Sequence, residues 1–344
     1  EPDLGHASVG KRLLGRRETH AASPMGDAAF FFALQYAGRA RENREKGGGP
    51  MRYPVISGLV VAVACVVGSA AGAGAGEMPK QLVLAVTPSN IPTELFKAGE
   101  VFAAELGKKL GLSIKVYMPT DYLGVVEALR NKTADLAFVH PAGYVFANRE
   151  AKAQIVAVDV WHGKTSYTSR IYVRKDSGLN SLEALRGKTI AFVDPGSTSG
   201  YVYPMVMLIK KGLVKERDPK TFFKDAMFAG THEAALLALL NGSVDAVASF
   251  DLAPQQYLKD KERVEKVTYI AETEPIPEAG VIVREGLDPG LVKKLFDALM
   301  TFNAPEYRPI LKDFYGIDGF APGRDSDYDP VREAIDMLGW RPKR

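Results

Sequence analysis

Three consecutive hydroxyl residues stand where a predicted strand turns into a predicted helix. The segment 193–201 reads Val-Asp-Pro-Gly-Ser-Thr-Ser-Gly-Tyr. The first N–H groups of a helix have no internal partner, and the helix dipole favours negative charge there. The hydroxyls of Ser197, Thr198 and Ser199 can donate to the same bound oxygens. The segment therefore indicates an oxyanion site. The alternative is a plain helix cap, which needs fewer than three hydroxyls.

Catalysis by this turn is not expected. The turn lacks the GxxxxGK[ST] sequence of a P-loop, and Thr198 stands where the nucleophile turn GxSxG requires serine. A hydrolase or transferase would need a nucleophile with a base, for which Ser199, His232 and Asp251 are candidates. Nothing in their spacing requires that arrangement, so we expect no enzyme and no catalytic residues.

The histidines do not suggest a metal site. From residue 77 onward the chain has only His140, His162 and His232, without paired metal spacing, and it has no cysteine. We therefore expect neither a metal nor a cofactor. His140 follows a predicted strand, and open α/β sheets bind ligands beyond the carboxyl ends of their strands. His140 is thus a candidate binding residue, with a structural role as the alternative, whereas Trp161 and His162 are interpreted as a hinge or packing feature.

Residues 51–76 are typical of a secretory signal peptide. Met51 and Arg52 precede an apolar run and a tail of small residues. The run is shorter than the roughly 20 residues of a membrane span, although a membrane anchor is the alternative. We expect export to the periplasm, or tethering at the cell surface if Cys65 is acylated. Residues 1–50 precede this signal and are expected to be a non-native or disordered leader.

The charge of the chain argues against a nucleic-acid partner. The formal net charge of +3 arises in the first 76 residues, where nine Lys and Arg outnumber six Asp and Glu. The remaining chain has 35 residues of each sign. Nucleic-acid binding usually needs a strongly basic surface. With 344 residues, of which 46% are hydrophobic, the chain is long enough for two ordinary domains.

Strand-length apolar runs alternate with helical periodicity from about residue 80 onward, which predicts crossover helices and parallel sheet. The predicted strands are 82–86, 113–117, 135–139, 155–160, 166–174, 188–193, 226–229, 244–249, 266–271 and 279–284. The predicted helices are 94–110, 122–130, 142–149, 181–185, 198–211, 232–240, 289–303, 305–313 and 330–339. This order predicts an α/β fold of two lobes, each a mostly parallel sheet flanked by helices. Lobe one would comprise 80–165 plus 269–344 and lobe two 170–268, with crossings near 162–172 and 267–280.

Four stretches resemble the phosphate/phosphite/phosphonate-binding proteins of ABC transporters. They are the Ser-Thr-Ser-Gly turn at 197–200, Thr-Asp-Tyr-Leu-Gly-Val-Val at 120–126, Ala-Gly-Thr-His-Glu at 229–233 with Gly-Ser-Val-Asp at 242–245, and Ile-Pro at 276–277. The similarity runs in order over about residues 80–320. The resemblance implies the type-2 periplasmic-binding fold, in which two lobes joined by two hinge crossings close over a ligand.

The resemblance also implies roles for individual residues. Ser197, Thr198 and Ser199 would bind the phosphoryl oxygens, and Tyr122 and His232 would donate to the same group. Tyr167 would line the cleft at the first crossing. Asp251 lies near the place where the family has a carboxylate facing the ligand, and it could accept a hydrogen bond from a protonated ligand oxygen.

One position departs from the family pattern. Aminoalkylphosphonate binders carry an aspartate shortly after the Ile-Pro, where this chain has Ala279. Glu278 is adjacent, but neighbouring residues of a strand point to opposite faces. The departure favours a small ligand with an uncharged tail, such as phosphite or methylphosphonate.

The sequence thus predicts the substrate-binding component of an ABC importer for phosphonate, phosphite or a related phosphorus oxyanion. Its partners would be the ABC permease and ATPase subunits, and the protein would be a monomer. The alternatives are the same fold binding another anion such as a sulfonate, a ligand-sensing subunit and, least expected, an exported hydrolase.

Overall fold

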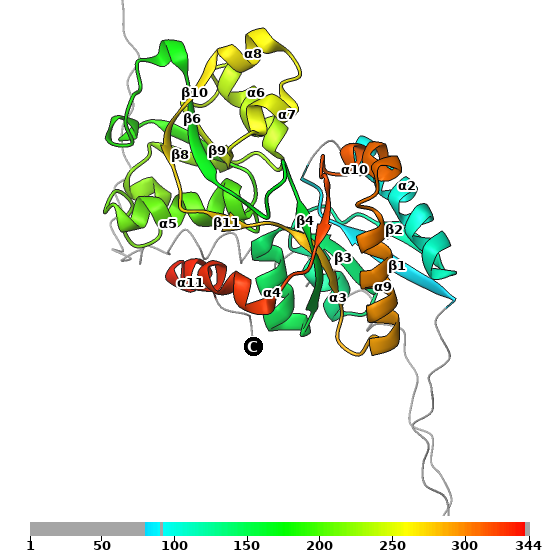
Figure 1. The fold of residues 1–344 in the computed structure, drawn as a ribbon. Coiled ribbons are helices and arrows are strands. Elements are labelled where there is room, and N and C mark those ends of the chain that lie inside the picture. Colours follow the sequence, from blue (N-terminus) through cyan, green and yellow to red (C-terminus); the bar gives the residue numbers. More distant parts are fainter. Residues whose placement is uncertain (1–79, 90–91, 341–344) are drawn as a thin grey trace, which may run out of the picture. The chain divides into compact units, whose positions relative to one another are not determined.

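The computed structural model describes residues 80–89 and 92–340, which form two large β-sheets flanked by helices and a third sheet of two short strands (Figure 1). The predicted leader, 1–50, and the predicted signal peptide, 51–76, lie outside the described residues. No helix of the described ranges is long and apolar enough to cross a membrane.

The first sheet has six strands in the order β13-β4-β12-β3-β1-β2. Their bounds are β1 Gln81–Val86, β2 Ser113–Tyr117, β3 Leu136–Val139, β4 Gln154–Val160, β12 Gly280–Val283 and β13 Gly319–Ala321. The second sheet has five strands in the order β10-β6-β9-β7-β8. These are β6 Ser169–Arg174, β7 Thr189–Phe192, β8 Asp225–Phe228, β9 Ala246–Phe250 and β10 Val267–Glu272.

Both sheets are mixed. In the first sheet β1 is parallel to β2 and β3, whereas β12 is antiparallel to β3 and β4, and β13 is antiparallel to β4. In the second sheet β7 is parallel to β8 and β9, whereas β6 is antiparallel to β9 and β10. The α/β class is confirmed, and the expectation of mostly parallel sheets is corrected. A parallel neighbour needs a crossover helix that brings the chain back to the same end of the sheet. Strands β6 and β12 each come directly after the chain passes from one sheet to the other, so they have no such helix before them.

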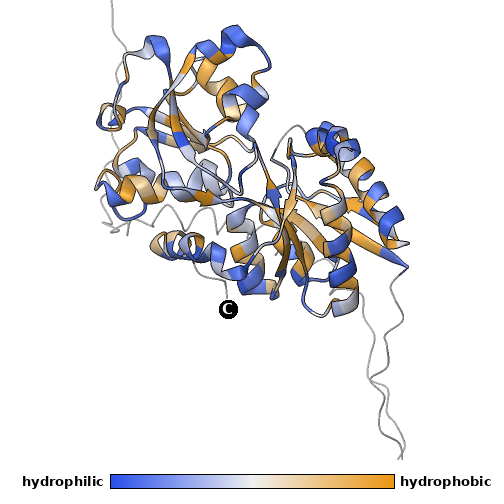
Figure 2. Cartoon of the chain, in the orientation of Figure 1, coloured by the Kyte–Doolittle hydropathy of each residue, from blue (hydrophilic) through white to orange (hydrophobic). Residues whose placement is uncertain are grey.

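Helices cover both faces of the first sheet. The described helices are α2 Pro92–Leu110, α3 Gly124–Arg130, α4 Pro141–Ala151, α5 Tyr203–Lys210, α6 His232–Leu240, α7 Ala253–Tyr257, α8 Lys261–Glu265, α9 Pro289–Thr301, α10 Arg308–Asp313 and α11 Asp329–Met337. Strand side chains alternate between faces. Leu82 and Leu84 therefore join a buried cluster with α2 and α9, whereas Ala85 joins one with α3 and α4. Figure 2 shows the resulting hydrophobic strands and hydrophilic outer helix surfaces.

The two segments that pass between the sheets pair with each other. The segment after β4 contains β5 (Ser166–Tyr167), and the segment after β10 contains β11 (Ile276–Pro277). The two strands are antiparallel, with Ile276 opposite Tyr167. The lobe boundaries drawn from the sequence remain a prediction.

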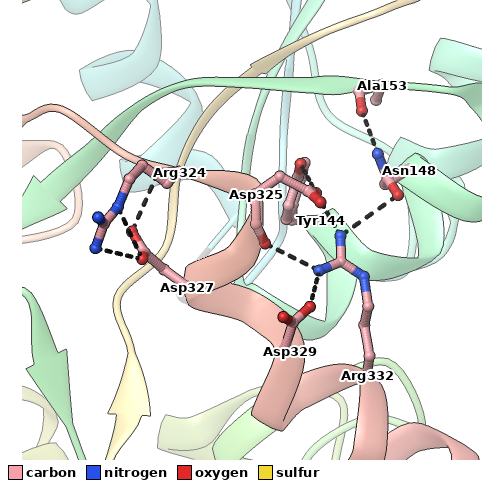
Figure 3. Close-up of polar contacts among 8 residues, drawn as sticks. All are labelled: Tyr144, Asn148, Ala153, Arg324, Asp325, Asp327, Asp329 and Arg332. Atoms are coloured by element: carbon pink, nitrogen blue, oxygen red, sulfur yellow. Dashed lines mark hydrogen bonds and ion pairs between the residues drawn. The ribbon is translucent and has the colours of Figure 1, made fainter.

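A polar network fixes the segment before α11 onto α4 (Figure 3). The guanidinium of Arg332 donates to Asp329 Oδ1 at 2.8 Å and also pairs with Asp325. Asp325 accepts from the Tyr144 hydroxyl of α4 at 2.5 Å. This anchoring holds the fully buried Tyr328, whose hydroxyl donates to the backbone oxygen of Glu278 at 3.0 Å. The C-terminal segment therefore positions the chain just before β12.

Several elements differ from the sequence-based expectations, among them the short α7, α8 and β11, which were not predicted. The helix predicted over 198–211 opens with a π-helical turn, Thr198–Val202, before α5. Pro204 has no N–H to donate to the Gly200 carbonyl, which accepts from Val193 at 3.1 Å instead. The strand predicted over 166–174 is two strands separated by Thr168, and β13 was not predicted because three residues show no periodicity.

Candidate ligand-binding site

A cavity between the two sheets brings together most of the predicted site residues. Its lining includes His140, Tyr167, Ser197, Thr198, Ser199 and His232, and the rest consists of Ser89, Phe138, Asp159, Trp161, Phe250, Gln256, Tyr257, Glu278, Ala279, Tyr315 and Ile317. Tyr122 and Asp251 are not part of the lining. Residues from both sheets contribute, so a ligand here would contact both sides.

The hydroxyl turn combines a helix cap with free donors. Ser197 Oγ accepts from Gly200 N at 3.1 Å, as the cap interpretation requires, and its own proton stays available. Thr198 and Ser199 open the helical turn, so their N–H groups have no acceptor inside it. A Cβ at Gly200 would lie 2.5 Å from Val193, so the turn can close only around glycine. The turn is buried and can offer hydroxyl and backbone donors to one anion.

Thr198 also links the two sides of the cavity. Its Oγ1 accepts from the backbone N of Ala142 in α4 at 2.8 Å. Ser199 is fixed by β6, because the Ser169 hydroxyl donates to the Ser199 backbone oxygen at 2.5 Å. Tyr167 of β5 lies beside both the Ser199 hydroxyl and Glu278. The cap residues are therefore fixed by both sheets and by the first crossing.

His232 is a neutral donor or acceptor at the start of α6. It is 3% exposed, and its Nδ1 lies 2.7 Å from the hydroxyl of Ser249. Burial, together with the neighbouring His140, lowers its pKa to about 3. When Ser249 donates to Nδ1, the proton resides on Nε2 and can be donated to a ligand. His232 thus supplies a hydrogen bond without a positive charge.

His140 and Tyr122 form a stacked pair on the first sheet. Their ring centroids are 5.5 Å apart. Nε2 of His140 and the hydroxyl of Tyr122 are buried, and neither has a hydrogen-bond partner among the residues described. Burial lowers the pKa of His140 to about 4. Tyr122 lies close to Ser197. Both groups can donate or accept without carrying a charge.

Two buried carboxyl groups line the opposite side, and the sequence analysis had not identified either as a site residue. Asp159 of β4 is 4% exposed and Glu278 is 7% exposed. Asp159 Oδ1 and Glu278 Oε1 have no hydrogen-bond partner among the described residues. Burial raises the pKa of both groups, and each carboxyl is near the other. An aspartate near the carboxyl end of an apolar strand was the signal that could have identified Asp159.

The expectation that Glu278 points away from Ala279 is wrong, because both residues line the cavity. They precede β12 and lie outside its regular pleat. Glu278 N donates to Thr165 O at 2.9 Å, whereas Ala279 O accepts from Asp159 N at 3.2 Å. The two residues are thus held by different segments.

Asp251 lies behind the cavity wall. Its backbone oxygen accepts from the Tyr172 hydroxyl at 2.7 Å and from Arg170 at 2.9 Å. Its Oδ1 is buried and has no partner in the described ranges, and burial raises the pKa of this carboxyl. A direct ligand contact by Asp251 stays a prediction, as do the other assigned roles.

The remaining lining is largely aromatic. Trp161, expected to be a hinge or packing residue, contributes to it together with Phe250, Tyr257 and Tyr315. The lining contains no lysine or arginine. The described residues also hold no group of three or more His, Cys, Asp or Glu side chains arranged to bind a metal. The cavity would therefore hold an anion through neutral donors.

Comparisons with known proteins agree with this architecture. The family model described as "ABC transporter, phosphonate, periplasmic substrate-binding protein" matches residues 84–328. The phosphate-import protein PhnD of Mycolicibacterium smegmatis is 30% identical over 281 residues, which cover 76% of this chain and 87% of that protein. The phosphonates-binding periplasmic protein of Escherichia coli is 29% identical over 275 residues, which cover 76% and 78%.

Solved structures share the fold. A binding protein component of an ABC phosphonate transporter from Pseudomonas aeruginosa has a TM-score of 0.69 and 24% identity, covering 75% of this chain and 86% of that chain. PhnD1 from Prochlorococcus marinus in complex with methylphosphonate has a TM-score of 0.68 and 22% identity, covering 76% and 98%. The two-lobed periplasmic-binding fold is thereby confirmed.

Proposed function

The chain belongs to the family of periplasmic substrate-binding proteins of phosphonate ABC transporters, and from this premise we propose that its cavity binds a phosphonate, phosphite or related phosphorus oxyanion. The observation that carries the proposal is the turn Thr198–Val202 with its cap Ser197. Hydroxyls and backbone N–H groups converge there on one buried wall of the cavity. Such donors suit the tetrahedral oxygens of a phosphoryl group.

Neutral donors complete the proposed binding set. His232 and His140 are buried and uncharged near neutral pH, and Tyr167 lies at the crossing between the sheets. Hydrogen bonds to a charged group contribute roughly 1.5–3 kcal/mol each. Several of them together could compensate for the missing lysine or arginine.

The transport role follows from family membership, and its details are proposed. Rotation at the paired segments β5 and β11 would open and close the cavity. The closed form would present one surface to a permease coupled to an ATPase. The protein would act in the periplasm as a monomer, without catalysing a reaction.

Calorimetric titration of the purified protein tests the proposal. The ligands are methylphosphonate, phosphite, phosphate and sulfate, and the variant is Ser197→Ala/Ser199→Ala. We expect a phosphorus oxyanion to bind the wild type and the double variant to bind it at least about 100-fold more weakly, equivalent to roughly 2.7 kcal/mol.

Ser243→Ala, an exposed hydroxyl outside the cavity, is the matched control and should bind as the wild type does. Binding of sulfate but of no phosphorus compound would redirect the proposal to another anion. Absence of binding to a folded protein freed of carried-over ligand would refute it.

A further inference from the structure

Asp159 and Glu278 face the same cavity from neighbouring segments. Asp159 lies on β4, and its backbone N donates to Ala279 O at 3.2 Å, immediately beside Glu278. The Tyr328 hydroxyl holds the Glu278 backbone oxygen at 3.0 Å from the other side. Both side chains are more than nine-tenths buried, and each has a carboxyl oxygen without a partner in the part of the chain that the structure describes. Because both residues line the cavity, this unused hydrogen-bonding capacity lies beside it.

Within residues 80–89 and 92–340, no positively charged group is found beside these carboxyls. The groups that face them are Tyr167 on β5, Tyr315 after α10, Tyr328 before α11, and Asp251 after β9. His140 and His232 share the cavity but are neutral. Arg170, which lies near Asp251, pairs with Glu272 at 2.5 Å. Two buried carboxylates without a cation cannot both be ionised at low cost.

This arrangement distinguishes between charge states of an anion. A carboxylate that keeps a free oxygen can accept a hydrogen bond from a ligand P–OH group. It would repel an unprotonated oxygen at the same place. Such a mismatch leaves buried acceptors facing each other, which is a strong basis for rejecting a ligand.

We propose that Asp159 and Glu278 share one proton and accept the hydroxyl of a singly protonated oxyanion, so that the cavity takes a singly charged ligand and rejects a doubly charged one. The inference rests on the proposed function. A monoanion binds without a net proton change. A dianion binds only after taking up one proton from solvent, which becomes the P–OH proton.

Proton counting by calorimetry tests the inference. Methylphosphonate is titrated into wild-type protein in two buffers of different ionisation enthalpy, at several pH values above and below neutrality. Where the free ligand is mostly a dianion, we expect about one proton taken up per ligand and an affinity that falls about tenfold per pH unit. Binding of methylphosphonate without proton uptake would overturn this inference and leave the proposed function standing.

The double variant Asp159→Asn/Glu278→Gln supplies a gain-of-binding test. Sulfate has no proton to donate at neutral pH, so the wild type should exclude it. The variant should gain sulfate affinity at least about tenfold relative to methylphosphonate. If the pair had only a structural role, the double variant would bind both ligands more weakly by the same factor. An unchanged ratio of sulfate to methylphosphonate affinity would therefore count against the proposal. Glu274→Gln, an exposed glutamate, is the matched control.

Two further measurements test the shared proton, one with an amine-bearing ligand and one without any ligand. If 2-aminoethylphosphonate binds the wild type more tightly than methylphosphonate and loses this advantage in the double variant, the pair binds a cation and the shared proton is refuted. Infrared spectroscopy of the ligand-free protein should show a protonated-carboxyl band at neutral pH that the double variant lacks. Absence of the band in the wild type would overturn the proposal even if no ligand bound.

Discussion

The two walls of the cavity are built on opposite principles. The wall from the second sheet presents donors, with Ser197, Thr198 and Ser199 in a helical turn and His232 beside them. The wall from the first sheet also carries His140, and it presents Asp159 and Glu278, whose acceptor oxygens have no partner among the described residues. We call this carboxyl pair the acid wall. A fully ionised anion satisfies only the donor wall, whereas a protonated one satisfies both. The hydroxyl turn thus supplies most of the affinity, and the carboxyl pair selects between charge states.

The largest effect should come from breaking the donor wall at Gly200. A Cβ there would lie 2.5 Å from Val193 and 2.8 Å from Ser197 Oγ. Gly200→Ala should abolish methylphosphonate binding and lower the free energy of unfolding by about 1–3 kcal/mol, because the overpacked turn must shift. Titration and denaturant unfolding measure the two effects. Gly99→Ala, whose Cβ would make ordinary contacts at 3.5 Å inside α2, should leave binding unchanged and should not lower the free energy of unfolding.

The next largest effect should come from His140, and it should appear in the free energy of unfolding at acidic pH. Its pKa is lowered to about 4 in the folded protein, whereas the unfolded chain takes up the proton near pH 6.5. The free energy of unfolding contributed by this residue therefore falls as pH drops from about 6.5 to about 4. In denaturant unfolding, the His140→Asn variant should therefore lose about 2 kcal/mol less stability than the wild type over this pH range. A His140→Asn variant that loses stability in acid as steeply as the wild type does would contradict this assignment.

The stability contributed by the acid wall should change with pH in the opposite direction. Burial raises the pKa of Asp159 to about 7 and that of Glu278 well above its ordinary value. The folded pair retains protons that the unfolded chain releases above about pH 4. Its contribution to the free energy of unfolding therefore falls as pH rises from about 4 to about 7.

Glu278→Gln should raise the free energy of unfolding near pH 7 to 8 by about 1–2 kcal/mol and leave it unchanged near pH 4. Unfolding at both pH values, with Glu274→Gln as the control, measures this difference. A variant that is destabilised at both pH values would show that Glu278 is held as a structural residue.

The smallest effect should come from the anchor of the acid wall. Tyr328→Phe removes the hydrogen bond to the Glu278 backbone oxygen but keeps the ring packed on Tyr144 at 4.6 Å. It should cost about 1 kcal/mol of unfolding free energy and weaken methylphosphonate binding less than the donor-wall variants do. Equal losses from Tyr328→Phe and from Gly200→Ala would remove the distinction between the walls.

The sequence predicted the donor wall better than the acid wall for a physical reason. Ser197, Thr198 and Ser199 are consecutive, so a local rule about helix N-termini identifies them. Asp159 and Glu278 are far apart in sequence and meet because β12 enters the first sheet beside β4. That pairing depends on the passage of the chain between the sheets, which no local pattern encodes.

The same distinction holds for the fold. Alternation of apolar residues indicated most strands and longer helices, such as β1 and α2. It did not show the π-helical opening of the helix predicted over 198–211, which follows from the missing N–H of Pro204 and the Val193–Gly200 bond. Strand direction at β6 and β12 also depended on the crossings rather than on local sequence.

A crystal structure with methylphosphonate bound would test the central claim most directly. The account predicts phosphonate oxygens within hydrogen-bonding distance of the Ser197–Ser199 turn, with one oxygen facing the Asp159 and Glu278 carboxyls. A ligand bound elsewhere, or one whose oxygens all turn away from the carboxyl pair, would contradict the division of the cavity into a donor wall and an acid wall.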